Sequence, residues 1–134
     1  MSAQFQSRLD GAVPLGKRIR AHLAIARFDH VTKNVFILPG IAIPLSVQPE
    51  LWTSGTALRV LYGLIAASLI ACSNYVINEV LDAPYDRFHP SKRTRPVAAG
   101  LVHIPLAYVQ WLLMMAAGLA IGLLVSKPFV IVLI

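Results

Sequence analysis

Charge and cysteine are both scarce in this sequence. Of its 134 residues, 13% are charged and 57% are hydrophobic, whereas an average soluble domain has about 25% charged residues. This composition argues against a soluble globular protein and favours one whose helices lie in a bilayer. The single cysteine, Cys72, lies inside an apolar run and excludes an internal disulfide. The first 14 residues are polar and irregular, so we expect no cleavable signal peptide.

Most of the sequence consists of long apolar stretches. They cover residues 31–48, 57–82 and 104–126. A transmembrane helix needs about 20 apolar residues, so the first stretch, which contains Pro39 and Pro44, is marginal unless it extends backward or tilts. Another apolar run begins at Phe129 and is too short to cross, so we expect the chain to stop inside a fourth helix. Residues 31–134 therefore predict the amino-terminal part of an all-α, polytopic transmembrane helical bundle, with about three full spans plus the start of a fourth.

Positive charge is concentrated in two places. Of the twelve Lys and Arg residues, six lie within residues 1–33 and four within 87–95. Residues 1–30 predict a cytoplasmic basic arm, in which 15–28 form an amphipathic helix at the membrane interface; the alternative is an arm surrounded by solvent. Two spans separate this arm from the 83–103 loop, so the positive-inside rule places both in the cytoplasm. We expect an integral protein of a prokaryotic plasma membrane, without a nucleic-acid partner.

A polar ladder ends the second apolar stretch. Asn74, Asn78, Asp82 and Asp86 follow one another at intervals of four and so share one face of a helix. Polar and ionisable groups at membrane depth are costly, which makes such a cluster a candidate functional site. We interpret Asn78, Asp82 and Asp86 as magnesium ligands, because Mg²⁺ prefers oxygen ligands and completes its shell with water and substrate phosphates. Asn74 is better explained as an interhelical hydrogen-bond partner, and Glu79 is either a further ligand or an interfacial charge.

A cationic segment follows the ladder at once. Its members are Arg87, Lys92, Arg93 and Arg95. Cationic side chains suit the phosphate oxygens of a diphosphate, and Arg binds them in bidentate geometry, although some of these residues serve topology instead. Ladder and cations together predict a magnesium–diphosphate site at a membrane surface. No general base stands out, because His89 and His103 are better explained by loop structure.

The same residues carry a resemblance to a known family. The pattern Asn78-x3-Asp82-x3-Asp86, followed by HP-x-KR-x-RP and Gly100, resembles the first Asp-rich motif of the UbiA superfamily of intramembrane prenyltransferases. The runs RFDHVTKNVFILPG and DRFHPSKRTRPVAAG more narrowly resemble its decaprenyl-phosphate phosphoribosyltransferase branch. The resemblance implies an all-helical membrane fold around a cavity, two Asp-rich motifs, bound magnesium and a diphosphate substrate. It also implies that Lys33 binds phosphate together with the cations of the loop.

The resemblance leaves the reaction open between two transfers. Most members move a prenyl group from a polyprenyl diphosphate to an aromatic or other acceptor, whereas the phosphoribosyl branch moves phosphoribose from phosphoribosyl pyrophosphate to a polyprenyl phosphate. The dense cations of residues 87–95 favour the phosphoribosyl donor, which carries several phosphates. A non-catalytic, half-length membrane scaffold is the alternative from another class. The second Asp-rich motif has no counterpart before Ile134, so we expect this polypeptide to be inactive by itself.

Overall fold

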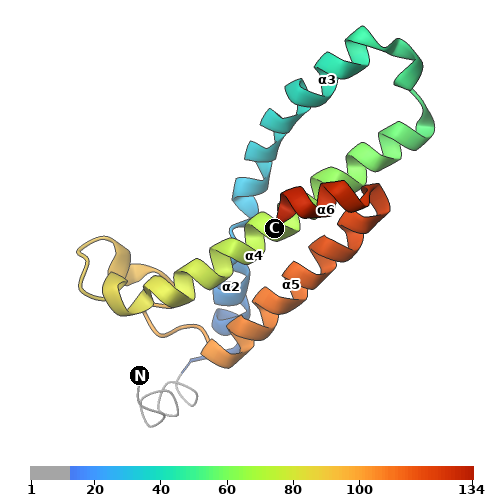
Figure 1. Cartoon of the computed structure of the whole chain (residues 1–134). Helices are drawn as coiled ribbons and strands as arrows, with labels where there is room; N and C mark the ends of the chain where they lie inside the picture. Colours follow the sequence, from blue (N-terminus) through green and yellow to red (C-terminus); the bar gives the residue numbers. More distant parts are fainter. Residues whose placement is uncertain (1–12) are drawn as a thin grey trace. The chain divides into compact units, whose positions relative to one another are not determined.

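The structure is a computed structural model that describes residues 13–134, without the side chains of residues 34 and 35. Within this range the chain forms helices and connecting turns and no strand (Figure 1), which confirms the predicted all-α class. The α-helices are α2 (Leu15–Ile25), α3 (Leu38–Val47), α4 (Ser54–Asp86), α5 (Ile104–Val125) and α6 (Lys127–Leu133), and the 3₁₀ helices are η1 (Phe28–Ile37), η2 (Pro49–Leu51) and η3 (Lys92–Thr94). Residues 1–12 of the predicted basic arm lie outside the described part of the chain.

Three segments are long and apolar enough, by length and composition, to cross a membrane. They are Leu15–Val47, Ser54–Asp86 and Ile104–Val125. The first joins α2, η1 and α3, so it contains the predicted span at 31–48 except for its last residue, and also the basic stretch before it. The position of that basic stretch at the membrane interface stays a prediction. The expected number of about three full spans is confirmed, and α6 supplies the expected start of a fourth helix.

Helix α4 is longer than a bilayer requires. Its 33 residues rise about 50 Å at 1.5 Å per residue, while the hydrocarbon core is about 30 Å thick. The helix begins where Thr53 Oγ1 accepts a hydrogen bond of 3.1 Å from the Thr56 N–H, and it continues through Pro84 to Asp86. This excess length allows the polar carboxyl end of α4 to lie at the membrane surface.

The described residues divide into two compact units, and the polar ladder belongs to the first. This unit comprises residues up to Phe28 together with Ser73–Leu113, that is α2, the carboxyl half of α4, the loop after it and the start of α5. Gln110 of α5 joins α2 through two hydrogen bonds of 2.9 Å, because its amide N–H donates to the His22 carbonyl and its amide oxygen accepts from the His22 ring. The largest fully buried aliphatic side chains of this unit come from α2, α4 and the loop: Ile25, Val76, Val97 and Val102.

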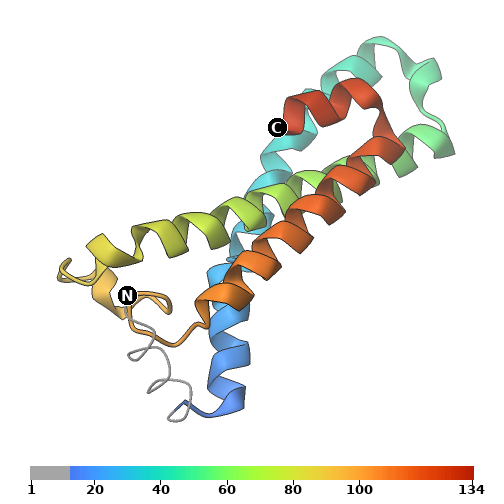
Figure 2. The same cartoon turned by 60° about the horizontal axis from the view of Figure 1, so that its bottom comes forward.

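The second unit comprises Asp29–Cys72 and Met114–Ile134. Gly118 of α5 approaches α4 so closely that a Cβ atom there would lie 2.9 Å from Ile70 Cδ1. Small residues permit such close approach between helices in a membrane. Ser126 caps α6, because its Oγ accepts a hydrogen bond of 3.2 Å from the Phe129 N–H. Helix α6 then folds back from the end of α5 (Figures 1 and 2) and brings the Phe129 ring against Gly63 of α4.

Candidate functional site

A polar pocket of about 190 Å³ lies at the carboxyl end of α4. It is lined by Arg27, Tyr75, Asn78, Glu79, Asp82 and Arg95. Two of the predicted ligands, Asn78 and Asp82, therefore line one pocket, and both are exposed. Their spacing of four residues on a continuous helix explains why they meet, because side chains at i and i+4 lie on one face. The pocket combines side-chain oxygen atoms from α4, which can bind a metal ion, with the guanidinium groups of two arginines outside this helix.

Asp86, the third predicted ligand, has other partners in the structure. Its side chain is buried, and its Oδ2 accepts a hydrogen bond of 2.7 Å from Arg95 Nη1. Its Oδ1 lies 3.9 Å from Lys92 Nζ. A carboxylate at the carboxyl end of a helix is disfavoured by the helix dipole, and these two cations compensate for it. Asp86 is not among the residues that line the pocket, and its role as a metal ligand stays a prediction.

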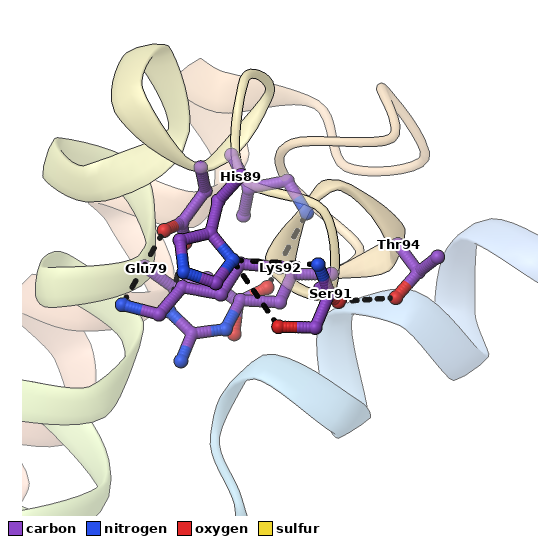
Figure 3. A network of polar contacts seen from close by, with 8 residues as sticks. Glu79, His89, Ser91, Lys92 and Thr94 are labelled. Carbon is purple, nitrogen blue, oxygen red and sulfur yellow. Dashed lines mark hydrogen bonds and ion pairs between the residues drawn. The ribbon is translucent and has the colours of Figure 1, made fainter.

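The loop after α4 is an ordered series of tight turns (Figure 3). The Thr94 hydroxyl donates to the Ser91 carbonyl at 3.1 Å, and the Ser91 N–H donates to His89 Nδ1 at 3.3 Å. These contacts agree with the structural role expected for His89. Gly100, with φ of 76°, adopts the left-handed conformation that glycine tolerates best. The loop therefore presents its cations on a fixed backbone.

Glu79 connects this loop to α4. Its side chain is buried, and its Oε1 accepts a hydrogen bond of 3.3 Å from the Val97 N–H. Val97 is itself buried and follows Arg95 by two residues. Glu79 and Val97 are far apart in the sequence, so the sequence alone did not predict their hydrogen bond. It left the role of Glu79 open between a metal ligand and an interfacial charge.

Arg27 is a pocket residue that sequence reasoning missed. Its guanidinium carbon lies 5.6 Å from the centroid of the Tyr75 ring, within the range of a cation–π contact. Its backbone has φ of 49°, a left-handed conformation that is uncommon outside glycine. In the sequence, Arg27 belongs to the amphipathic stretch 15–28 and also opens the run RFDHVTKNVFILPG. No motif or residue spacing in the sequence pointed to Tyr75 as a pocket residue.

The remaining predicted phosphate ligands lie outside the pocket lining. Arg87 is half-buried just after α4, and Arg93 is exposed in η3. Lys33 is exposed in η1 and belongs to the second unit. Lys92 also lies outside the lining, next to Asp86. For these four residues, phosphate binding stays a prediction.

The donor set of the pocket fits a hard divalent cation. Within residues 13–134 there is no cluster of three or more His, Cys, Asp and Glu side chains arranged to hold a metal ion. The pocket offers instead the amide of Asn78 and the carboxylate of Asp82, while the Glu79 carboxylate accepts the Val97 N–H. Mg²⁺ is commonly held by one or two carboxylates and takes its other ligands from water and substrate phosphates. The negative end of the α4 dipole adds to the attraction for a cation.

Several curated bacterial proteins are similar to this chain, and two of them are named decaprenyl-phosphate phosphoribosyltransferase. The decaprenyl-phosphate phosphoribosyltransferase of Mycolicibacterium smegmatis is 33% identical over 101 residues, which are 75% of this chain and 32% of that protein. The enzyme of the same name from Corynebacterium glutamicum is 30% identical over 95 residues, or 70% and 28% of the two chains. An uncharacterized protein of Sinorhizobium fredii is 30% identical over 114 residues, or 85% and 21%. This chain thus spans between 21% and 32% of the length of these curated relatives.

No solved structure matches this chain. The family model described as the UbiA prenyltransferase family matches residues 34–134. This match includes the whole polar ladder, the loop and α5. Because it covers most of the sequence, the chain belongs to the UbiA prenyltransferase family.

Proposed function

We propose that this chain supplies the first magnesium–diphosphate motif of an integral membrane transferase that moves phosphoribose from phosphoribosyl pyrophosphate to a polyprenyl phosphate. The observation that carries this proposal is the pocket in which Asn78 and Asp82 lie beside the guanidinium groups of Arg27 and Arg95. Two relatives named decaprenyl-phosphate phosphoribosyltransferase support the choice of donor and acceptor. The matched regions are 32% and 28% of these two relatives.

Each pocket residue has a distinct task in this proposal. Asn78 and Asp82 hold Mg²⁺, which when bound neutralises charge on the diphosphate leaving group. Arg27 and Arg95 bind the phosphate oxygens through charge-assisted hydrogen bonds. The Tyr75 ring supports the Arg27 guanidinium at the pocket wall. The pocket therefore binds and orients the donor, while no residue of this chain is assigned as a general base.

The distribution of Lys and Arg residues sets the proposed orientation of the protein in the membrane. The amino-terminal segment and the 83–103 loop hold most of the positive charge, and short basic segments face the cytoplasm. A cytoplasmic pocket at the end of α4 is open to a water-soluble phosphoribosyl donor. The polyprenyl phosphate reaches the same level from the bilayer, because its phosphate lies at the headgroup layer.

A prenyl transfer to an aromatic acceptor is the second candidate. The description of the matching family favours it, and a polyprenyl diphosphate presents the same magnesium-binding group to the pocket. The two reactions differ in which substrate carries the diphosphate. A non-catalytic scaffold is disfavoured, because an exposed Asp82 beside two guanidinium groups serves no purpose in packing.

The test offers both substrate pairs to membranes that contain the complete gene product. One reaction holds phosphoribosyl pyrophosphate labelled in its ribose, polyprenyl phosphate and Mg²⁺, and the other holds a prenyl diphosphate, Mg²⁺ and an aromatic acid labelled in its ring. We expect label in the lipid fraction of the first reaction only. Label in the second reaction alone would establish prenyl transfer, and no label in either would favour the scaffold.

A matched pair of variants tests the metal ligand. Asp82→Asn should reduce transfer at least tenfold, about the lower effect of losing a metal-site contact, and should raise the Mg²⁺ concentration needed for half-maximal rate. Tyr85→Phe changes an exposed side chain of the same helix turn outside the pocket lining, and it should leave the rate unchanged. Full activity of Asp82→Asn would contradict the assignment.

A further inference from the structure

We propose that Glu79 is a positioning residue whose carboxylate fastens the loop to α4 and thereby holds the Arg95 guanidinium at the pocket. This inference deepens the proposed function and rests on it for the identity of the bound anion. It assigns Glu79 to the loop backbone and not to the metal.

The contact between Glu79 and Val97 is protected from water. The two residues are 5% and 1% exposed, and Glu79 Oε1 lies 3.3 Å from the Val97 nitrogen. A buried N–H without an acceptor is strongly unfavourable, and a charged acceptor makes the stronger hydrogen bond. The bond joins positions 18 residues apart, so it fixes where the loop meets the helix. Figure 3 shows Glu79 close to His89 and Lys92 of the loop.

Arg95 is held at its backbone and at its side chain. The Ala99 N–H donates to the Arg95 carbonyl at 2.8 Å, in the turn that contains Val97. At the other end, Arg95 Nη1 donates to Asp86 Oδ2 at 2.7 Å. Glu79 anchors the backbone of this turn, and Asp86 orients the guanidinium. Two carboxylates of α4 thus place one cation at a pocket that both Glu79 and Arg95 line.

A metal ligand and a loop anchor respond differently to the same substitutions. Gln at position 79 keeps a carbonyl oxygen of the same reach, which accepts the Val97 N–H but lacks the negative charge that attracts Mg²⁺. Ala removes the acceptor and the charge together. The positioning role therefore predicts that Glu79→Gln rescues what Glu79→Ala loses, whereas a ligand role predicts that both variants fail.

The binding experiment uses the complete gene product in lipid nanodiscs, with inorganic pyrophosphate and Mg²⁺ as the probe in calorimetry. We expect Arg95→Ala to weaken pyrophosphate binding about tenfold, since it loses a hydrogen bond to a charged group, and Glu79→Ala to weaken it similarly, because the released loop no longer holds Arg95 at the pocket. The double variant should bind no more weakly than Arg95→Ala, because residues acting as one unit are not additive. Glu79→Gln and Tyr85→Phe should stay close to the wild type. Additive losses, or a Glu79→Gln variant as weak as Glu79→Ala with reduced Mg²⁺ affinity, would overturn the proposal.

A second readout needs no ligand and separates this inference from the proposed function. Trypsin cleaves after Lys92 and Arg93, which are exposed in the loop. Release of the loop in Glu79→Ala should raise the cleavage rate at least severalfold, while Glu79→Gln should resemble the wild type. If the wild type fails to bind pyrophosphate but this cleavage pattern holds, the proposed function fails and the loop anchor stands. Equal cleavage of wild type and Glu79→Ala refutes the anchor.

Discussion

The packing of Gly118 against α4 gives a quantitative prediction. In Gly118→Ala, the new Cβ would lie 2.9 Å from Ile70 Cδ1, 3.0 Å from Ile70 Cγ1 and 3.2 Å from the Ala66 carbonyl oxygen. Real Cβ atoms essentially never approach closer than 3.0 Å. Ile70 is 6% exposed and has little room to move, and the Ala66 oxygen belongs to the helix backbone. Overpacking of this kind costs about 1–3 kcal/mol.

Gly63→Ala provides the matched control for this prediction. Its Cβ would meet the Phe129 ring at 3.5 Å, an ordinary van der Waals contact. Both substitutions gain the same helix propensity, about 1 kcal/mol at most, so the difference between them isolates packing. We expect Gly118→Ala to unfold about 5- to 150-fold more readily than Gly63→Ala, the equivalent of about 1–3 kcal/mol.

The assay is denaturant unfolding of the protein in micelles, followed by the fluorescence of its two tryptophans. A double-mutant cycle with Ile70→Ala adds a rescue, because shortening Ile70 makes space for the new methyl group. The double variant should be more stable than the sum of the single effects predicts, as expected for residues in contact. Equal stability of Gly118→Ala and Gly63→Ala, or strict additivity in the cycle, would refute the close approach of α5 to α4.

The remaining predictions concern the pocket and the elements that support it. Arg27→Ala should raise the KM for the diphosphate donor by about 10- to 100-fold, the effect of losing a hydrogen bond to a charged group, and Arg27→Lys should recover part of it; an unchanged KM in steady-state kinetics would remove Arg27 from the site. Gly100→Ala should lower the free energy of unfolding by about 1 kcal/mol or more, because φ of 76° is strained for alanine; a melting temperature at or above that of the wild type would contradict this. Gln110→Leu removes both hydrogen bonds to His22 and should accelerate trypsin cleavage in α2, whereas equal cleavage would show that α2 docks by other contacts.

The loop and the polar ladder show which neighbours a sequence pattern can predict and which it cannot. A spacing of four placed Asn78 and Asp82 on one face, because helix periodicity is a local property of the chain. The same pattern assigned Asp86 to that site, yet its position next to the loop gives it Arg95 and Lys92 as partners. Those contacts depend on the path of the loop, which no local periodicity encodes. The role of Asp86 as a ligand therefore remains a prediction that the Asp86→Asn variant can test.

By itself, the sequence determined the all-α class, the three apolar spans, the cationic loop and the family, because composition, periodicity and motif spacing are written in consecutive residues. Only the tertiary structure decided that Arg27 and Tyr75 join the pocket and that Glu79 bonds to the Val97 backbone. These groups meet because α2, α4 and the loop share a buried core of aliphatic side chains. Such a meeting depends on long-range packing, which brings together residues that are distant along the chain.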